Sequence, residues 1–430
     1  MNYIYQKNIA TQTESKFLNV MAFIIGVMSY VNFKLIGDFY PVEVILAFMV
    51  PLLWSRKSGL LRDQHVKILL MFGSLWLMSQ LSTDLFRQTT VTDSLRGCLS
   101  VLFFLFDFVG LYILISGRLK RLMIFLMGYS IGGVLQQSIF PSVLGSAHPW
   151  KFGYGFSIAL LLLIFIVFIN GNNTKKLKWW ALPLAVFGIL SIYLDYRSLG
   201  AISILTAFMI SVRCAWLNQM LIYKFRPMFL FMAGVIVLSV GLSIIKIYGY
   251  SSEQGWLGDH AKMKYEMQAS GSGGILLGGR MEWIAGVPAI IDSPFIGHGS
   301  WAKNSNYREL YRNLIDLNYG LSAAEIDKWI KKSDLIPAHS HILQSWIWAG
   351  FLGALFWFVV LYLVLKVMIH AYRFPSPLLV IVLFFSILSI WDIFFSPFGS
   401  TMRMQWAFRL VIFVTSYQLS QYVKRGLLIK

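Results

Sequence analysis

Charged residues are scarce in this chain. Only 13% of its 430 residues are Asp, Glu, Lys or Arg, against about 25% in an ordinary soluble domain. Hydrophobic residues make up 57% and aromatic residues 16%. This balance excludes a soluble globular protein and a disordered chain. It predicts a chain that is embedded in a membrane, with aromatic side chains at the two interfaces.

Cysteine and the common soluble-enzyme motifs are also lacking. The two cysteines, Cys98 and Cys214, are too few for a secreted disulfide scaffold, and we expect no disulfide between them. The sequence contains no phosphate-binding loop, no dinucleotide fingerprint and no paired metal ligands at helical spacing. It therefore predicts neither a nucleotide cofactor nor a metal site.

The charge that is present is unbalanced, with 37 Lys and Arg against 19 Asp and Glu and a net charge of +18. In a soluble protein this excess would suggest a nucleic-acid partner. Here the basic residues lie in short clusters between apolar runs, so orientation in a membrane explains them, and an anionic substrate could share in the effect. We expect no nucleic-acid partner.

Apolar runs long enough to cross a membrane recur along the whole chain. A spanning helix needs about 20 mostly apolar residues. The runs predict about twelve spans, at residues 17–36, 39–54, 68–83, 97–116, 122–141, 153–170, 179–194, 199–213, 228–247, 342–365, 377–395 and 404–422. The first run is too long for the core of a signal peptide, so we expect it to be retained.

Basic clusters fall in every second connection between these spans. The clusters are Arg56, Lys57, Arg62 and Lys67; Arg118, Lys120 and Arg121; Lys175, Lys176 and Lys178; Arg213, Lys224 and Arg226; Lys366 and Arg373; Lys424, Arg425 and Lys430. Cytoplasmic loops carry the excess of Lys and Arg in membrane proteins. The alternation predicts that both termini are cytoplasmic.

One connection is long and polar. Because it follows the ninth predicted span, and the N-terminus is predicted to be cytoplasmic, we expect this connection on the outer side of the membrane. The chain thereby divides into residues 1–247 with spans one to nine, residues 248–341 as the outer segment, and residues 342–430 with spans ten to twelve. Asn306 with Glu309, and Ser322 with Glu325, form capping-box patterns before apolar residues at helical spacing. We expect two short amphipathic helices in the outer segment.

Two arginines stand where a phosphate could bind. Arg280 follows a glycine-rich stretch and precedes a predicted helix over 281–292 that contains Pro288. A cation beside a helix N-terminus suits an anionic phosphate. Arg197 lies at the predicted outer face, next to Asp195. The simpler alternatives are a flexible linker before Arg280 and a structural Arg197–Asp195 pair.

Two histidines, His339 and His341, lie at the junction of the outer segment and the tenth span. Histidine is the side chain most easily tuned to accept a proton near neutral pH. No nearby Cys, Asp or Glu completes a metal-ligand set. The pair is therefore a candidate general base, with a structural role as the alternative.

Three sequence blocks, in this order, resemble those of the O-antigen ligase and Wzy-type polymerase superfamily. The blocks are Tyr196-Arg197-Ser198-Leu199-Gly200; Gly279-Arg280-Met281-Glu282-Trp283 continuing to Asp292-Ser293-Pro294-Phe295-Ile296-Gly297-His298-Gly299; and His339-Ser340 with Gly350 and Gly353, which matches the pattern H-[NSQ]-x9-G-x-x-G. The large outer segment between the ninth and tenth spans is similar to that family's topology.

The resemblance implies an all-α integral membrane protein of the bacterial inner (plasma) membrane. Its fold would be of the GT-C glycosyltransferase type, with about twelve transmembrane helices and a site at the periplasmic face. The donor would be a glycan on undecaprenyl diphosphate, and no nucleotide sugar, cofactor or metal would be needed. A flippase and a chain-length regulator are expected partners besides membrane lipids.

The resemblance also implies roles for particular residues. His339 would deprotonate the acceptor hydroxyl, since it holds the position with the matching glycine spacing, while Arg197 and Arg280 would bind the diphosphate and stabilise its developing charge. The secondary candidates are His341, Asp195, Glu282 and His298.

Three functions stay open at this point. A polymerase would transfer the growing chain to the next lipid-linked repeat unit of an O-antigen, capsule or exopolysaccharide, and the block around Arg197 favours this reading. A ligase would attach the glycan to lipid A-core. A transporter or flippase for lipid-linked oligosaccharide would need more acids in the spans than Glu43, Asp107 and Asp392.

Overall fold

The computed structural model describes most of the chain, namely residues 10–35, 37–115, 117–170, 177–216, 281–319 and 334–425, together with Ile326 and part of 246–266. Within these ranges nearly every element is a helix. One small antiparallel hairpin is present, in which β1 (Phe33–Lys34) pairs with β2 (Asp38–Phe39). Most of the predicted ninth span, Arg280 and most of the second predicted amphipathic helix lie outside the described residues.

The helices follow the apolar runs of the sequence. They are α1 (Ala10–Met28), α2 (Pro41–Lys57), α3 (Gln64–Phe86), α4 (Val91–Ile115), α5 (Leu119–Ile139), α6 (Val143–Ala147), α7 (Gly155–Asn170), α8 (Lys178–Tyr193), α9 (Arg197–Trp216), α14 (Met281–Asp292), α15 (Ser305–Tyr319), α17 (His341–Arg373), α18 (Leu379–Phe395) and α19 (Ser400–Lys424). A 3-10 turn, η1 (Ser58–Arg62), precedes α3, and a π-helical turn, η2 (Trp150–Tyr154), leads into α7.

Several helices are long and apolar enough to cross a membrane. By length and composition, five stretches of the described chain qualify: Gln64–Phe86, Val91–Ile115, Leu119–Ile139, Trp150–Asn170 and His341–Arg373. Shorter apolar helices add Lys16–Met28, Pro41–Leu52, Lys178–Tyr193 and Leu379–Phe395. The prediction of an all-α chain with membrane-spanning helices is confirmed at this level, and the number of about twelve spans stays a prediction.

The first predicted span, 17–36, is wrong at its end. Helix α1 stops at Met28, and the chain continues into the β1–β2 hairpin. Asn32 and Lys34 interrupt the apolar run at this point. An average over a window of about 20 residues conceals these two polar positions.

Glycines bring α1 and α5 into close contact. A methyl group on Gly26 would come within 2.5 Å of the Phe125 carbonyl oxygen, and one on Gly128 would come within 2.3 Å of the Phe23 carbonyl oxygen. Gly128 and Gly132 have the G-x-x-x-G spacing that lets helix backbones approach in membranes. This contact therefore depends on the absence of side chains.

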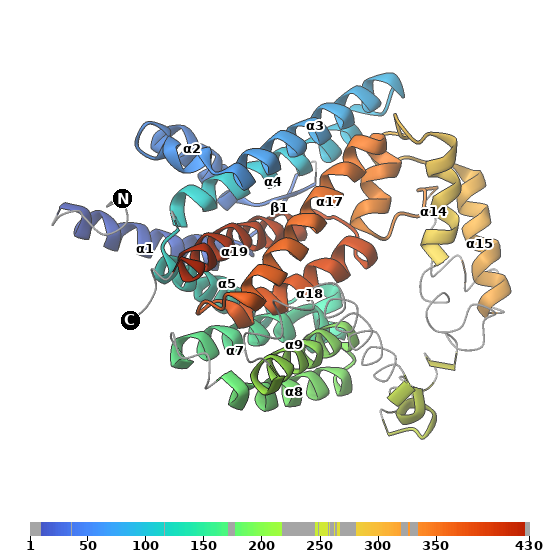
Figure 1. Ribbon diagram of the computed structural model, residues 1–430. Coiled ribbons are helices and arrows are strands. Elements are labelled where there is room, and N and C mark those ends of the chain that lie inside the picture. The colour runs from blue at the N-terminus through green and yellow to red at the C-terminus, as the bar shows by residue number, and fades with distance from the viewer. Residues whose placement is uncertain are drawn as a thin grey trace.

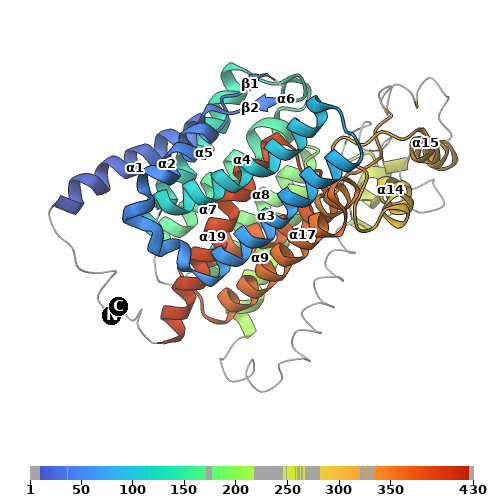
Figure 2. The same cartoon turned by 90° about the horizontal axis from the view of Figure 1, so that it is seen from above.

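The long helices form a bundle, and α14 and α15 lie side by side at one end of it, near the start of α17 (Figure 1; Figure 2). Helix α17 packs against α3 and α18, and α14 packs against both α15 and α17. We call this the α14 end of the bundle. The beginnings of α17 and α19 and the ends of α3 and α18 converge at this end.

Polar side chains also join the helices at the other end of α17. Lys366 Nζ lies 3.1 Å from His65 Nε2, and Arg213 Nη1 donates to the Tyr372 carbonyl oxygen at 2.5 Å. Helix α3 begins at Asp63, which accepts a hydrogen bond from the His65 backbone N–H at 2.8 Å. Lys366 and Arg213 belong to two predicted cytoplasmic clusters, and His65 lies in the connection that carries a third, so residues of three predicted cytoplasmic connections meet at one end.

Candidate functional site at the α14 end

The two candidate histidines lie in different environments at the start of α17. Ser340 caps this helix, because its Oγ accepts a hydrogen bond from the Leu343 backbone N–H at 2.9 Å. His339 precedes the cap and is exposed, whereas His341 is the first helical residue and is fully buried. A change from extended to helical backbone at Ser340 separates the two side chains.

Both ring nitrogens of His341 are engaged. Trp406 Nε1–H donates to His341 Nε2 at 2.6 Å, and His341 Nδ1 lies 2.5 Å from the Ser396 carbonyl oxygen. A carbonyl only accepts hydrogen bonds, so the proton is on Nδ1 and the ring is neutral. The ring also contacts Trp357 and Phe398. This arrangement suits a structural linker between α17 and α19.

Residues 394–398, which comprise the end of α18 and the three residues after it, connect several elements. Three alternate carbonyl oxygens of this segment accept hydrogen bonds from side chains of α14 and α17. These are Phe394 from Trp283 Nε1 at 2.9 Å, Ser396 from His341 Nδ1 at 2.5 Å, and Phe398 from Gln344 Nε2 at 2.9 Å. The carbonyl groups in the last turn of a helix and in the irregular residues after it lack backbone partners, so the side chains satisfy them instead. The 394–398 segment thereby fixes α14 relative to α17.

A buried ion pair adjoins this segment. Asp392 Oδ2 accepts from Arg409 Nη1 at 2.6 Å, and Asp392 Oδ1 accepts from Ser396 Oγ at 2.8 Å. Only 1% of Arg409 and 4% of Asp392 are exposed. The pair ties α18 to α19, and removal of one partner would leave a buried charge.

Helix α9 packs against α18, which contributes Asp392 to this ion pair. Tyr196, the residue before α9, and His341 both lie close enough to Asp392 and Arg409 to interact with their charges. Arg197 follows Tyr196 directly and is the first residue of α9. The beginnings of α9 and α17, each with a candidate residue, therefore lie around one buried pair.

Arg197 forms an ion pair with Asp195, as the simpler sequence reading predicts. Arg197 Nε lies 3.5 Å from Asp195 Oδ1, and about a quarter of each side chain is exposed. Asp195 has a positive φ of 58°, a conformation that Asp adopts more readily than most residues. The turn presents the arginine at the rim of the bundle with a carboxylate beside it.

Helix α14 forms over the predicted range, with Pro288 inside it. Glu282 Oε1 accepts from Tyr311 Oη at 3.0 Å, which joins α14 to α15. A methyl group on Gly286 would come within 2.8 Å of the Pro337 carbonyl oxygen. Helix α14 thus packs directly against the segment that leads to His339.

The turn after α14, residues 293–300, is attached to the end of α3. Arg87, directly after α3, donates to Ser293 Oγ at 2.7 Å and to the Gly297 carbonyl oxygen at 2.9 Å. Asp84, in the last turn of α3, accepts from the backbone N–H and from the Oγ of Ser300, both at 2.6 Å. Charge-assisted bonds of this kind are stronger than neutral ones. They hold the second sequence block in a fixed conformation.

The same turn inserts into a break in α17. Gly350 has φ 68° and ψ −161°, which is not helical. The carbonyl groups before the break would lack helical partners, and the turn and α3 supply donors to them. The backbone N–H of His298 donates to the Ile347 carbonyl oxygen at 2.6 Å, and that of Gly299 donates to the Trp348 carbonyl oxygen at 3.1 Å. Ser79 Oγ of α3 donates to the Ala349 carbonyl oxygen at 2.7 Å. The glycines of the second and third blocks thus meet each other.

The His298 side chain takes part in packing the turn. Its Nε2 lies 2.6 Å from the Ala289 carbonyl oxygen and must be the protonated nitrogen. Its ring meets that of Tyr307, whose hydroxyl donates to Asp292. Burial and the Asp292 carboxylate raise the pKa of Tyr307 to about 12, so this hydroxyl stays a proton donor at neutral pH.

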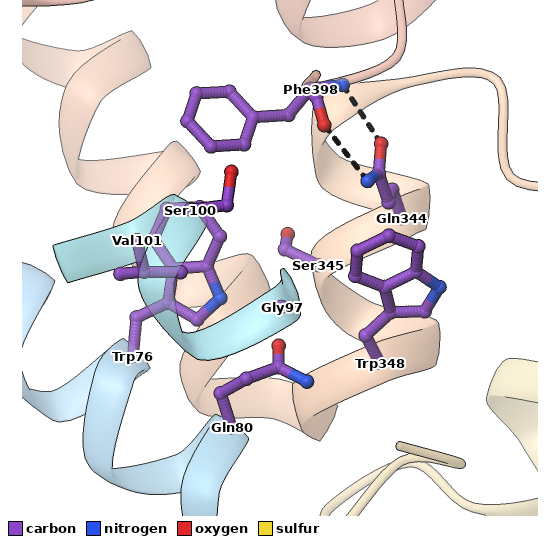
Figure 3. A pocket seen from close by; sticks show the side chains of 9 residues that line it. All are labelled: Trp76, Gln80, Gly97, Ser100, Val101, Gln344, Ser345, Trp348 and Phe398. Carbon is purple, nitrogen blue, oxygen red and sulfur yellow. Dashed lines mark hydrogen bonds between the residues drawn. The ribbon is translucent and has the colours of Figure 1, made fainter. Parts of the chain in front are cut away.

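A small pocket lies between α3, α4 and α17 at this end. Trp76 and Trp348 are on opposite sides of it, and Gly97 lies between them (Figure 3). Gln344 lines it too, but its amide is used by both backbone groups of Phe398. The pocket has room for about one water molecule.

Glu43 and Asp392, two of the acids in the spans, form ion pairs with arginines. Arg403 binds Glu43 through two hydrogen bonds of 2.6 and 3.0 Å, and both are buried. Asp107 is fully buried, and neither of its oxygens has a hydrogen-bond partner among the described residues. The part of the chain that the structure describes holds no group of three or more His, Cys, Asp or Glu that could bind a metal.

Sequence reasoning missed residues that organise this site. Asp84, Arg87 and Arg409 lie in or beside apolar runs, and they acquire their roles only through partners more than a hundred residues away or on another helix. A charge within an apolar run was the available signal, since such a charge is costly without a partner. Arg280 lies outside the described residues, so its position relative to Arg197 is an expectation.

No protein-family model matches this chain, and no curated protein matches it either. Function is therefore inferred from the residues, their geometry and the resemblance of the three blocks.

Proposed function

We propose that this chain is a metal-independent membrane glycosyltransferase that uses a glycan on undecaprenyl diphosphate as donor. In this proposal it works at the periplasmic face of the bacterial inner membrane, and it polymerises lipid-linked repeat units of a surface polysaccharide. The α14 end is the active face. The outer segment covers it, and the acceptor glycan reaches the site from the periplasm.

One observation supports the proposal more than any other. An exposed histidine, His339, and a partly exposed arginine, Arg197, lie at the starts of α17 and α9, and both helices pack against α18, which carries Asp392 of the buried ion pair. All three blocks of the family resemblance contribute to this region, although they are far apart in the sequence. A general base and an anion-binding cation are the groups that the reaction needs.

The arginines act on the leaving group. A diphosphate gains negative charge as its bond to the sugar breaks, and guanidinium groups bind such oxygens in a bidentate manner. Asp195 orients the Arg197 guanidinium through the 3.5 Å contact at Nε. Arg280, which directly precedes α14 in the sequence, binds the same anion in this proposal, and the N-terminal N–H groups of α14 add to the positive potential.

His339 acts on the acceptor. Its imidazole takes the proton from the acceptor hydroxyl as that oxygen bonds to the anomeric carbon of the donor sugar. The bond from this carbon to the phosphate oxygen breaks at the same time, and its electron pair leaves with undecaprenyl diphosphate. One glycosidic bond forms for each lipid diphosphate released, and the proton on His339 returns to water.

The orientation is supported by the opposite end of α17. Lys366, Arg213 and the residues after Asp63 gather there, and predicted cytoplasmic loops supply all of them. If that end is cytoplasmic, the α14 end faces the periplasm. The lipid-linked donor would meet the site there after it has crossed the membrane.

Arginine variants test the proposal. In cells that lack the native gene, we expect Arg197→Ala and Arg280→Ala to lower polysaccharide synthesis about 10²–10³-fold at equal membrane abundance, because each removes a donor to the developing charge. Arg197→Lys and Arg280→Lys should recover only a small part, since an ammonium group cannot donate in a bidentate manner.

Arg308→Lys is the matched control. Arg308 lies in the outer segment and pairs with Asp334 at 2.6 Å, but it has no role in the proposed reaction, so the variant should keep near-normal activity. Full activity of Arg197→Lys and Arg280→Lys would contradict diphosphate binding. Polysaccharide on lipid A-core without any increase in chain length would identify a ligase instead.

A further inference from the structure

Trp301 is held in a conformation that is unusual for its residue type. Its φ is +54°, in the left-handed region where bulky side chains are outliers. Neighbouring contacts fix it there: Asp84 holds Ser300, and the Ala302 carbonyl oxygen accepts from the Ile336 N–H at 2.9 Å. Glycine or asparagine would adopt this backbone more easily.

The indole of Trp301 nevertheless remains in contact with solvent. Its exposed fraction is 36%, so burial does not account for a large aromatic residue at a strained position. The ring faces Trp348 of α17, with centroids 5.4 Å apart and an interplanar angle of 35°. The two rings form a partly open aromatic surface, which we call the Trp301–Trp348 platform.

Polar groups lie close to the platform. Two residues along from Trp301, Lys303 Nζ lies 3.5 Å from Asp93 Oδ2, and 59% of the Lys303 side chain is exposed. Trp348 also lines the small pocket together with Ser100 (Figure 3). An aromatic surface with a few polar groups at its edge is typical of a ligand site.

The platform is also near the proposed base. Lys303 and Leu335 form an antiparallel bridge, and Ile336 is bonded to Ala302. The chain runs from Ile336 to His339 in three residues. The segment that contains Trp301 is therefore the immediate neighbour of the segment that contains His339.

We propose that the Trp301–Trp348 platform binds a sugar ring of the acceptor glycan, and this inference rests on the proposed function. One face of a pyranose ring carries C–H groups, and their partly positive hydrogen atoms are attracted to the negative face of an indole. Its hydroxyl groups would bond to the polar residues at the border. Stacking there would hold the acceptor while one of its hydroxyl groups lies within reach of His339.

Binding is measured on the purified full chain in lipid nanodiscs. The probe is the repeat-unit oligosaccharide released by mild acid from the lipid-linked glycan of cells that express the chain, and saturation-transfer NMR gives its affinity. We expect Trp301→Ala and Trp301→Gly to lower the affinity about three- to tenfold, which is the size of an aromatic stacking contribution. Trp301→Phe should retain most of it.

Two variants separate stacking from folding. Trp301→Gly relieves the backbone strain, so a loss of affinity with unchanged thermal stability comes from the ring. Trp256→Ala is the matched control, because Trp256 is another exposed tryptophan of the outer segment, 65% exposed, and it should bind normally. In a transfer assay, Trp301→Ala should raise KM for the acceptor and leave kcat and the KM for the donor nearly unchanged.

Unchanged affinity in a folded Trp301→Ala protein would overturn the proposal. A second outcome would also overturn it. If spin-labelled lipids quench the fluorescence of Trp301, measured as the signal that Trp301→Phe removes, and the oligosaccharide does not protect against this quenching, then the ring is an interfacial anchor. If the oligosaccharide binds in a Trp301-dependent manner but no glycan is transferred, the proposed function is refuted and the sugar-binding role of the platform stands. If glycan is transferred and Trp301→Ala has an unaltered KM for the acceptor, the proposed function stands and the role of the platform is refuted.

Discussion

His339 and His341 are two positions apart, and their environments are opposite. His341 is surrounded by Trp357, Phe398 and Trp406 and uses both ring nitrogens. His339 lies before the cap of α17 and is exposed. Under the proposed function, a group that must exchange protons with a substrate belongs at the exposed position.

The sequence predicts part of this difference and not the rest. A helix that begins between the two residues predicts that their side chains diverge, because consecutive helical residues are 100° apart. The partners of His341 could not be predicted, since Ser396 and Trp406 belong to other elements. Long-range hydrogen bonds of this kind leave no periodic signal in a single sequence.

We expect His339→Ala and His341→Ala to fail in different ways. His339→Ala should lower the rate of polysaccharide synthesis about 10²–10⁴-fold, the usual contribution of a general base, with normal membrane abundance. His341→Ala should mainly lower stability, by about 1–3 kcal/mol for each buried group left unpaired. Synthesis per unit of protein and thermal unfolding in detergent measure the two effects.

The opposite pattern would refute the assignment of the base. If His339→Ala is active at normal abundance, and His341→Ala is stable but inactive, then the buried histidine carries the chemistry.

At the scale of elements, the break in α17 at Gly350 organises the α14 end. The turn 293–300 fills the break, and its backbone N–H groups replace the missing helical bonds. A side chain at position 350 would leave no room for the turn, because a methyl group on Gly350 would come within 2.0 Å of the Phe295 carbonyl oxygen. The glycine of the third block thus has a structural cause.

Gly350→Ala should therefore disturb both stability and activity. A non-glycine residue at this positive φ costs about 1–2 kcal/mol, and the contact with Phe295 would displace the turn that follows α14. We expect lower membrane abundance and little synthesis. Gly399→Ala is the control, because Gly399 has φ −118° and no atom within 4 Å of an added methyl group. Equal behaviour of the two variants would contradict this account of α17.

Helices were predictable where an apolar run has clear ends. The ranges of α5, α7, α8 and α18 agree with their predicted spans within a few residues. Capping was harder, because α15 begins after Asn304, whose side chain accepts from the Asn306 N–H at 2.9 Å. The predicted cap at Asn306 is wrong by two residues, since several asparagines and serines here can all cap a helix.

At the scale of the molecule, the two ends of the bundle differ in kind. The far end of α17 collects basic side chains from loops that are predicted to be cytoplasmic. The α14 end collects the candidate site residues. Composition alone predicted the membrane location, whereas the convergence of α9, α14, α17 and α18 on one region required their packing.

Reporter fusions test the orientation of the bundle. A fusion at the C-terminus should report the cytoplasm, and a fusion after Lys303 should report the periplasm, because the basic loops are retained inside. A fusion after Lys120, in a predicted cytoplasmic connection, serves as the internal reference. A periplasmic C-terminus would invert the bundle and remove the proposed site from the periplasmic face.

The most direct measurement uses the purified chain in liposomes with undecaprenyl-diphosphate-linked repeat units as the sole substrate. We predict release of undecaprenyl diphosphate in step with a ladder of longer lipid-linked glycans, without inhibition by EDTA and with loss of both products in His339→Ala. Movement of the intact lipid-linked glycan across the bilayer, with no release of undecaprenyl diphosphate, would contradict the account and identify a transporter.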